Sequence, residues 1–179
     1  MTTLLIQDTS VLLNLYASQR AAEIVHATGM VGVICREVVS ETLFIRDYET
    51  GARTSVDFSS LLATNAFRED QLEGEAELAD QIMFAARTGS DADAAVLSMA
   101  KHRNAHLACD DRLTRRLFME FGEESRMWST PRLVHDWARA SRIPEAEIRT
   151  LLDRVTKCCR YHPPRRDHLF AWWNGILPG

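Results

Sequence analysis

The chain has 179 residues, of which 46% are hydrophobic and 26% are charged, and its formal net charge is −4. These values are typical of a soluble globular protein with room for one domain and a short appendage. The acidic balance excludes attraction of nucleic acid by overall charge, so a polyanionic substrate would need local basic patches or a bound metal ion.

The apolar segments and the cysteine spacing indicate where the protein is located and which kinds of site it lacks. No apolar run approaches membrane length, and the start of the chain lacks the basic and apolar regions of a signal peptide, so we expect a cytoplasmic protein without membrane contact. The four cysteines form no C-x-x-C pair, and Cys158 and Cys159 are adjacent. This spacing argues against a zinc site and against a disulfide framework.

The amino-terminal part of the chain is predicted to alternate strands and helices. The apolar run 4–7 is followed by Asp8, which is typical of a strand that leads into a helix over 11–16. The β-branched run 31–35 predicts a second strand, and 36–46 predicts a helix.

The middle of the chain is mixed over residues 47–72, where 56–63 is predicted to be helical and 67–72 a polar connection. Acids cluster at the start of 73–87, Arg87 ends it and Gly89 follows. That arrangement predicts a helix whose end charges match its dipole and which a glycine terminates.

The remaining elements continue the alternation. Ser90 is predicted to open a helix over 91–102, and 107–109 is predicted to be a short strand. Strands that alternate with helices indicate a mostly parallel sheet with helices on both faces, the α/β class. Further helices are predicted over 110–122 and 144–159, and between them a helix that Thr130 caps and that runs from Pro131 to about Ser141.

Four acids occur at predicted helix starts or on apolar helix faces, where an ionised carboxylate is costly unless a cation accompanies it. They are Asp8, Glu41, Asp93 and Asp111. Asp8 fits a helix N-cap, and it also follows a strand, where α/β sheets bind ligands. Glu41 has the helical spacing of Ile34, Val38 and Ile45, so it is predicted to be buried beside an arginine or a metal ion.

Asp93 raises the same question in the next helix. Val96 and Leu97 follow it at helical spacing, which directs its side chain toward the core, whereas Asp91 is predicted to face solvent. A capping box with Ser90 is the structural alternative, and both roles can coexist. Asp110 and Asp111 follow a strand, and the pattern leaves open which of them caps the next helix and which faces the site.

Four segments carry a family resemblance. Residues 8–13 (DTSVLL) resemble the opening of a PIN domain, the nuclease fold of VapC-type toxins, and Val38 to Glu41 resembles the segment with that family's second acid. Residues 93–100 resemble the third acidic segment, and 107–112 resemble the fourth. Cys109 stands where that fourth segment usually has threonine, which removes a hydroxyl from the site.

The resemblance spans residues 3–135 and implies a PIN-like three-layer sandwich over 1–141, followed by a helical and aromatic extension over 142–179. It makes Asp111 the primary fourth acid and Asp110 an accessory one, and it implies that Ser10 orients the first acid or binds metal.

The chemistry implied is hydrolysis of RNA phosphodiester bonds with Mg²⁺ or Mn²⁺, because oxygen-only ligands suit these ions. Asp8, Glu41, Asp93 and Asp111 are the expected catalytic residues and metal ligands. We expect a homodimer that acts on RNA. One expected role is that of the toxin in a toxin–antitoxin pair, with an antitoxin protein as its partner. The alternative is a catalytically weak PIN module that binds nucleic acid or protein.

Two basic regions are candidates for substrate contact. Arg112, Arg115 and Arg116 share one face of their predicted helix and are predicted to bind phosphates, with an ordinary solvated face as the alternative. In the tail, Arg160, Arg165 and Arg166 occur with Tyr161, Trp172 and Trp173; these aromatics can stack on bases, but packing onto the chain's own domain or a dimer mate is favoured.

Overall fold

A computed structural model describes residues 3–41 and 43–177 and shows an α/β fold around a five-stranded sheet. The strand order is β5-β2-β1-β6-β7, and every pairing in this sheet is parallel. A separate antiparallel hairpin joins β3 and β4. The strands are β1 (Leu4–Gln7), β2 (Val31–Cys35), β3 (Phe44–Arg46), β4 (Arg53–Ser55), β5 (Phe67–Asp70), β6 (His106–Ala108) and β7 (Met127–Trp128).

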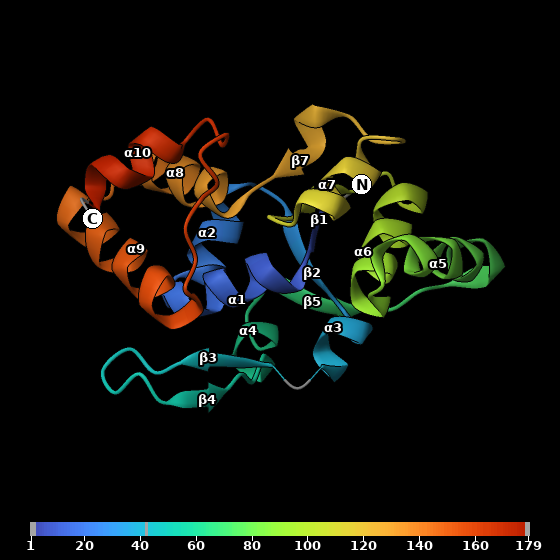
Figure 1. The fold of residues 1–179 in the computed structure, drawn as a ribbon, viewed down its shortest axis with the longest axis horizontal. Helices are drawn as coiled ribbons and strands as arrows, with labels where there is room; N and C mark the ends of the chain where they lie inside the picture. Colours follow the sequence, from blue (N-terminus) through green and yellow to red (C-terminus); the bar gives the residue numbers. More distant parts are fainter. Residues whose placement is uncertain (1–2, 42, 178–179) are drawn as a thin grey trace.

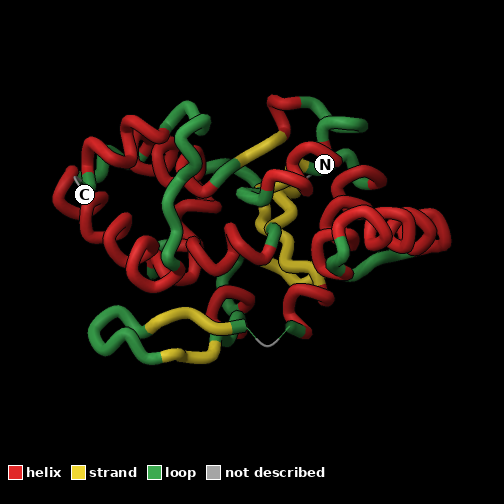
Figure 2. The backbone as a smooth tube through the Cα atoms, viewed as in Figure 1, coloured by secondary structure: helices red, strands yellow, loops and turns green. Residues whose placement is uncertain are grey.

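Helices cover both faces of the sheet, as the alternating pattern predicts (Figures 1 and 2). One face carries α3 (Arg36–Ser40), α5 (Gly74–Thr88), α6 (Asp91–His102) and α7 (Arg112–Phe118). The other side carries α1 (Thr9–Ser18), α2 (Ala21–Ala27), α4 (Ser59–Leu62), α8 (Thr130–Ala140), α9 (Glu145–Cys159) and α10 (Phe170–Ile176).

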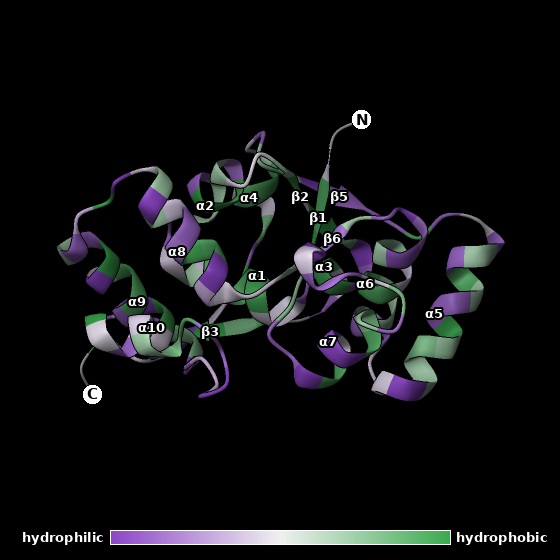
Figure 3. Cartoon of the chain, turned by 90° about the horizontal axis from the view of Figure 1, so that it is seen from above, coloured by the Kyte–Doolittle hydropathy of each residue, from purple (hydrophilic) through white to green (hydrophobic). Residues whose placement is uncertain are grey.

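The core follows the apolar strands at the centre of the sheet. Leu5 and Ile6 of β1, Val33 of β2 and Leu107 of β6 are fully buried, and Figure 3 shows β1 in the hydrophobic colour between the helical layers. Near-continuous apolar strands are expected when a parallel sheet is covered on both faces. The sheet therefore forms a rigid support for the residues that follow its strands.

Helix boundaries with strong local signals are confirmed. The hydroxyl of the predicted cap Ser90 accepts a hydrogen bond from the backbone amide three residues later. The cap of α8 is Ser129 and not the predicted Thr130, because the Ser129 hydroxyl accepts the corresponding amide hydrogen bond and Thr130 is the first helical residue. Pro131 lies in the first turn of α8, as predicted. Gly89 ends α5 with a left-handed backbone, φ +73°, which a glycine adopts without steric cost. Helix α2 was not predicted, and α7 ends at Phe118 rather than near Gly122.

Two predictions in the first half of the chain are wrong. The helix predicted over 36–46 stops at Ser40, and Phe44–Arg46 is instead a strand that pairs with Arg53–Ser55. The predicted polar connection at 67–72 contains β5, which pairs with β2 at the sheet edge. An edge strand can expose its charged side chains, so its sequence lacks the apolar signal of a central strand.

The predicted extension packs onto the rest of the chain. Helix α9 lies against α1 and the β3 strand, and α10 lies against α9. Trp173 of α10 is fully buried and belongs to the same hydrophobic cluster as the sheet residues. No helix within residues 3–41 and 43–177 is long and apolar enough to cross a membrane.

Candidate functional site

The candidate site lies where the order of the strands reverses. From central strand β1 the chain crosses to β2 on one side, whereas β6 pairs with β1 on the other side. In open parallel sheets, ligands bind at this switch point, beyond the carboxyl ends of the strands. Asp8 follows β1 and Asp110 and Asp111 follow β6, and the Asp8 amide donates a hydrogen bond to the Ala108 carbonyl at 2.9 Å.

Asp8 is a helix N-cap and also lies at the carboxyl end of β1. Its carboxylate caps α1 and accepts hydrogen bonds from the Ser10 amide at 3.4 Å and from the Ser10 hydroxyl at 2.7 Å. The residue is only 2% exposed, so these two bonds fix its direction at the end of β1. Ser10 therefore orients the first acid.

Asp93 provides the strongest sign that the acids meet. It is half-buried in the first turn of α6, and its pKa rises to about 6, mainly because burial disfavours the ionised form. The remaining increase in its pKa comes from the negative charges of Asp8, Asp111 and Glu41. Asp8, Glu41 and Asp111, which come from three other segments, thus lie within electrostatic reach of Asp93.

The neighbours of Asp93 separate its two predicted roles. Its backbone amide donates to the Ser90 hydroxyl at 3.2 Å, but the Ser90 amide donates to the Thr88 hydroxyl instead of to Asp93. The reciprocal bond of a capping box is therefore not made. Asp91 is exposed, as its helical position predicts.

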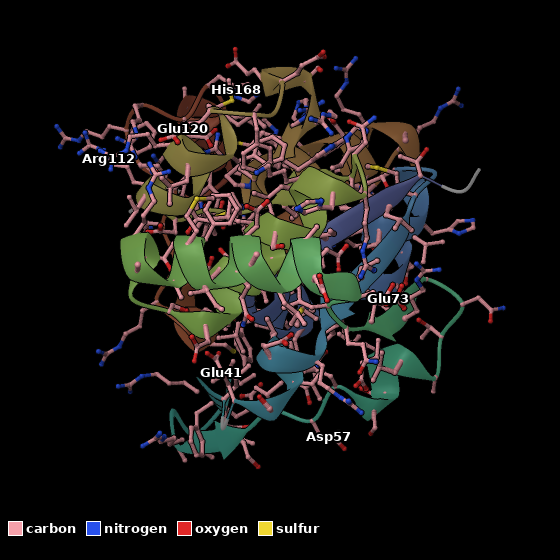
Figure 4. All side chains as sticks on the ribbon, turned by 90° about the vertical axis from the view of Figure 1, so that its right-hand side faces the viewer. Glu41, Asp57, Glu73, Arg112, Glu120 and His168 are labelled. Carbon is pink, nitrogen blue, oxygen red and sulfur yellow. The ribbon has the colours of Figure 1, made fainter. Side chains whose placement is uncertain are left out.

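Glu41 reaches the site for a reason that differs from the prediction. It is not buried on a helix face; it is exposed and caps the carboxyl end of α3 with an extended backbone. The helical spacing failed because Ile34 belongs to β2 and Ile45 to β3. The Thr9 hydroxyl donates to Glu41 Oε2 at 3.4 Å, which ties this carboxylate to the start of α1. Figure 4 shows Glu41 at the end of α3.

The two acids after β6 have different surroundings. Asp111 is exposed and caps α7, where its Oδ1 accepts from the Thr114 amide at 2.8 Å. Asp110 accepts from the Thr130 amide at 3.0 Å, from the Thr130 hydroxyl at 2.6 Å and from the Asn14 amide at 3.3 Å. Burial raises the pKa of Asp110 to about 6, although the Thr130 hydrogen bonds oppose that rise. Asp110 thus joins the end of β6 to α1 and α8.

Sequence reasoning missed the partners of these acids. Asn14 is only 2% exposed, and Thr130 is fully buried. The side-chain amide of Asn14 donates a hydrogen bond to the Thr130 hydroxyl at 3.1 Å. An asparagine within the apolar run of α1 is the signal that could have revealed Asn14, because a buried amide needs hydrogen-bond partners. Thr130 and Thr9 have no comparable signal, since their partners come from other parts of the chain.

The charge of the site has no internal counterion. No lysine, arginine or histidine in the described ranges forms an ion pair with Asp8, Glu41, Asp93 or Asp111. The oxygen donors and the accumulated negative charge suit a hard divalent cation. Yet among residues 3–41 and 43–177 no three acidic, histidine or cysteine side chains are grouped closely enough to hold one directly.

The predicted arginine face lies directly after the acids. Arg112 and Arg116 are exposed, and Figure 4 shows Arg112 extending from the surface. Arg115 is half-buried and donates to the Cys109 carbonyl at 2.9 Å, so part of its role is structural. All three line one surface hollow of about 320 Å³. Leu117 on the opposite face is buried, as predicted.

Two other hollows, of about 430 and 550 Å³, flank the β3–β4 hairpin, and neither includes any of the four acids. The functional assignment therefore depends on the carboxylates and not on hollow size. No family model, curated protein or solved structure matches the chain.

Proposed function

We propose that the chain is a metal-dependent ribonuclease with a PIN-like fold. The observation that carries this proposal is the approach of Asp8, Asp111 and Glu41 to the half-buried Asp93, whose pKa is raised by burial and by these three charges. Acids from four segments rarely gather without a counterion unless they bind a cation. The parallel sheet with helices on both faces agrees with the fold that the resemblance implies.

The four acids would hold Mg²⁺ or Mn²⁺, directly or through water. Such an ion supplies a bound water of lowered pKa and stabilises charge on the phosphate oxygens of a phosphodiester. Asp8 is held for this role by Ser10, and Asp110 fixes the end of β6 through Thr130. Glu41 and Asp111 are exposed, so they can move toward the more buried pair without breaking core packing.

The test is cleavage of a labelled single-stranded RNA with Mg²⁺ or Mn²⁺ and with EDTA. We expect metal-dependent cleavage by the wild type and loss of cleavage in Asp93→Asn. Asp91→Asn is the matched control, because it removes the same charge from the same helix turn at an exposed position. Equal loss in both variants, or cleavage in EDTA, would contradict the proposed site.

A second candidate function is a catalytically weak module that binds nucleic acid or protein. It is favoured by the absence, within the described ranges, of three side chains grouped to hold a metal ion. This alternative predicts RNA binding without cleavage at any Mg²⁺ or Mn²⁺ concentration. The same assay, run beside a binding measurement, separates the two functions. Co-purification of a small partner encoded beside this chain would support a toxin–antitoxin role.

A further inference from the structure

The segment between α9 and α10 is an anchored arm and not a loose tail. In Figure 1 it forms the long red loop that joins the two helices. Pro163 and Leu169 are buried at either side of its centre. The ring of Tyr161 packs edge-on against Trp173, with 5.6 Å between ring centroids. We call residues 160–169 the carboxyl-terminal arm.

Hydrogen bonds fix the turn at the centre of this arm. The Asp167 amide donates to the Pro164 carbonyl at 2.8 Å, and the Leu169 amide donates to Asp167 Oδ1 at 2.9 Å. The Phe170 amide then donates to the Asp167 carbonyl at 3.0 Å, which starts α10. Arg165 and Arg166 lie on this turn and are exposed, so the fold holds their backbone in place while their side chains are free to reach a ligand.

Arg166 meets the arginine face of α7. It lines the hollow of about 320 Å³ that also includes Arg112, Arg115 and Arg116. It also lines a smaller hollow of about 130 Å³ with Asp110 and Arg115. The two hollows adjoin at Arg115 and Arg166, which line both, and Asp110, which follows β6, lines the smaller one. We call the two adjoining hollows the trough. Arg165 lines neither hollow.

The trough carries the positive charge of four arginines. In the described ranges, none of its four arginines forms an ion pair with a carboxylate. Its acids are Asp110, Asp167 and Glu124, and the first two already accept hydrogen bonds from their own surroundings. Guanidinium groups bind phosphate oxygens through paired hydrogen bonds, so this charge suits the phosphodiester backbone of a nucleic acid.

We propose that Arg166 of the carboxyl-terminal arm is a substrate-binding residue that contacts the RNA backbone in this trough, together with the arginines of α7. The assignment rests on the proposed ribonuclease function and adds a contact from outside the region of the family resemblance. It gives the arm a role in substrate binding in addition to packing. Backbone contacts position a strand without reading its sequence, so the effect of Arg166 is the same for different sequences.

The experiment measures binding of a fluorescent single-stranded RNA across a salt series, with cleavage blocked by Asp8→Asn. Arg166→Gln is compared with Arg165→Gln, which removes the same charge from the same turn. We expect Arg166→Gln to raise Kd about tenfold at low salt, as for one lost charge-assisted contact. The slope of log K against log salt should fall by about 0.7, the value for one phosphate on a single strand. Arg165→Gln should match the parent protein in both measurements.

The outcomes distinguish the two proposals. Equal Kd and equal salt slope for Arg166→Gln and Arg165→Gln, in a protein whose wild type cleaves RNA, would overturn the role of Arg166 alone. Failure of the parent protein to bind RNA would overturn both proposals. Selective loss in Arg166→Gln, with two unrelated RNA sequences affected alike, supports the backbone contact.

Discussion

Replacing Asp93 with Asn is expected to stabilise the metal-free protein at neutral pH. The folded-state pKa of about 6, compared with an ordinary value of 3.8, corresponds to ~3 kcal/mol when the carboxyl must ionise. Asp93 is only half-buried, and solvent screening reduces this value to about 1–2 kcal/mol. For a chain of this length, that gain corresponds to a rise in Tm of roughly 2–8 °C.

The dependence on pH has a definite sign. The folded protein binds the Asp93 proton more tightly than the unfolded chain, so the contribution of Asp93 to stability is complete below pH 3.8 and is lost as pH rises to about 6. Asn carries no such penalty. The advantage of Asp93→Asn should therefore be full above pH 7 and should disappear near pH 4. Asp110 titrates in the same range but is present in both proteins, so its effect cancels in the difference.

Urea denaturation in EDTA between pH 4 and 8 measures this difference directly. Asp91→Asn is the control for loss of a negative charge in the first turn of α6, where both acids interact with the helix dipole. Its effect on the free energy of unfolding should be small and should not follow the same pH profile. A pH-independent difference for Asp93→Asn, or destabilisation at pH 7.5, would refute the argument that burial and the neighbouring acids raise the pKa of Asp93.

Three further predictions follow from other features. Mg²⁺ or Mn²⁺ at one hundred times its Kd should stabilise the wild type by about 2.7 kcal/mol, and the Tm of Asp8→Asn should rise less when metal is added. Identical wild-type melting curves with and without metal would count against the site. Replacing Arg112 and Arg116 with Gln should flatten the salt dependence of RNA binding, measured by fluorescence anisotropy, without loss of stability, because both side chains are exposed. Arg103→Met should cost about 3 kcal/mol in urea denaturation, because it removes the cation that bonds buried Glu77 at 2.8 Å; a loss below 1 kcal/mol would show that Glu77 finds another partner.

The parts of the fold that sequence predicted best have causes within a few residues. The start of α6 depends on Ser90, and Pro131 predicted the start of α8 to within one residue, so each signal lies beside the structure that it determines. Asp8 was found for the same reason, because the strand and the helix that flank it are both visible in the local pattern. Such signals act through hydrogen bonds and torsion angles of neighbouring residues.

The errors concern structure that distant residues decide. Glu41 was assigned to a helix because its spacing fitted, but the pairing of Phe44 with Ser55 takes the following residues into a hairpin. No period within 36–46 reveals that partner strand. The convergence of the acids required an argument about the whole sheet and a family resemblance, and the approach of Arg166 to α7 depends on how the arm folds back.

The packing of α1 has a consequence for the order in which the chain can fold. Leu12 and Leu15 are buried, and the Cys159 thiol, at the end of α9, lies 3.4 Å from the Leu13 carbonyl. The outer side of α1 is therefore covered only when α9, one of the last helices in the chain, packs against it. Contacts between such distant segments slow folding, and a nascent chain exposes the apolar side of α1 until α9 has been synthesised. A fragment of residues 1–141 would keep all four acids yet retain this exposed apolar side, and we expect it to aggregate.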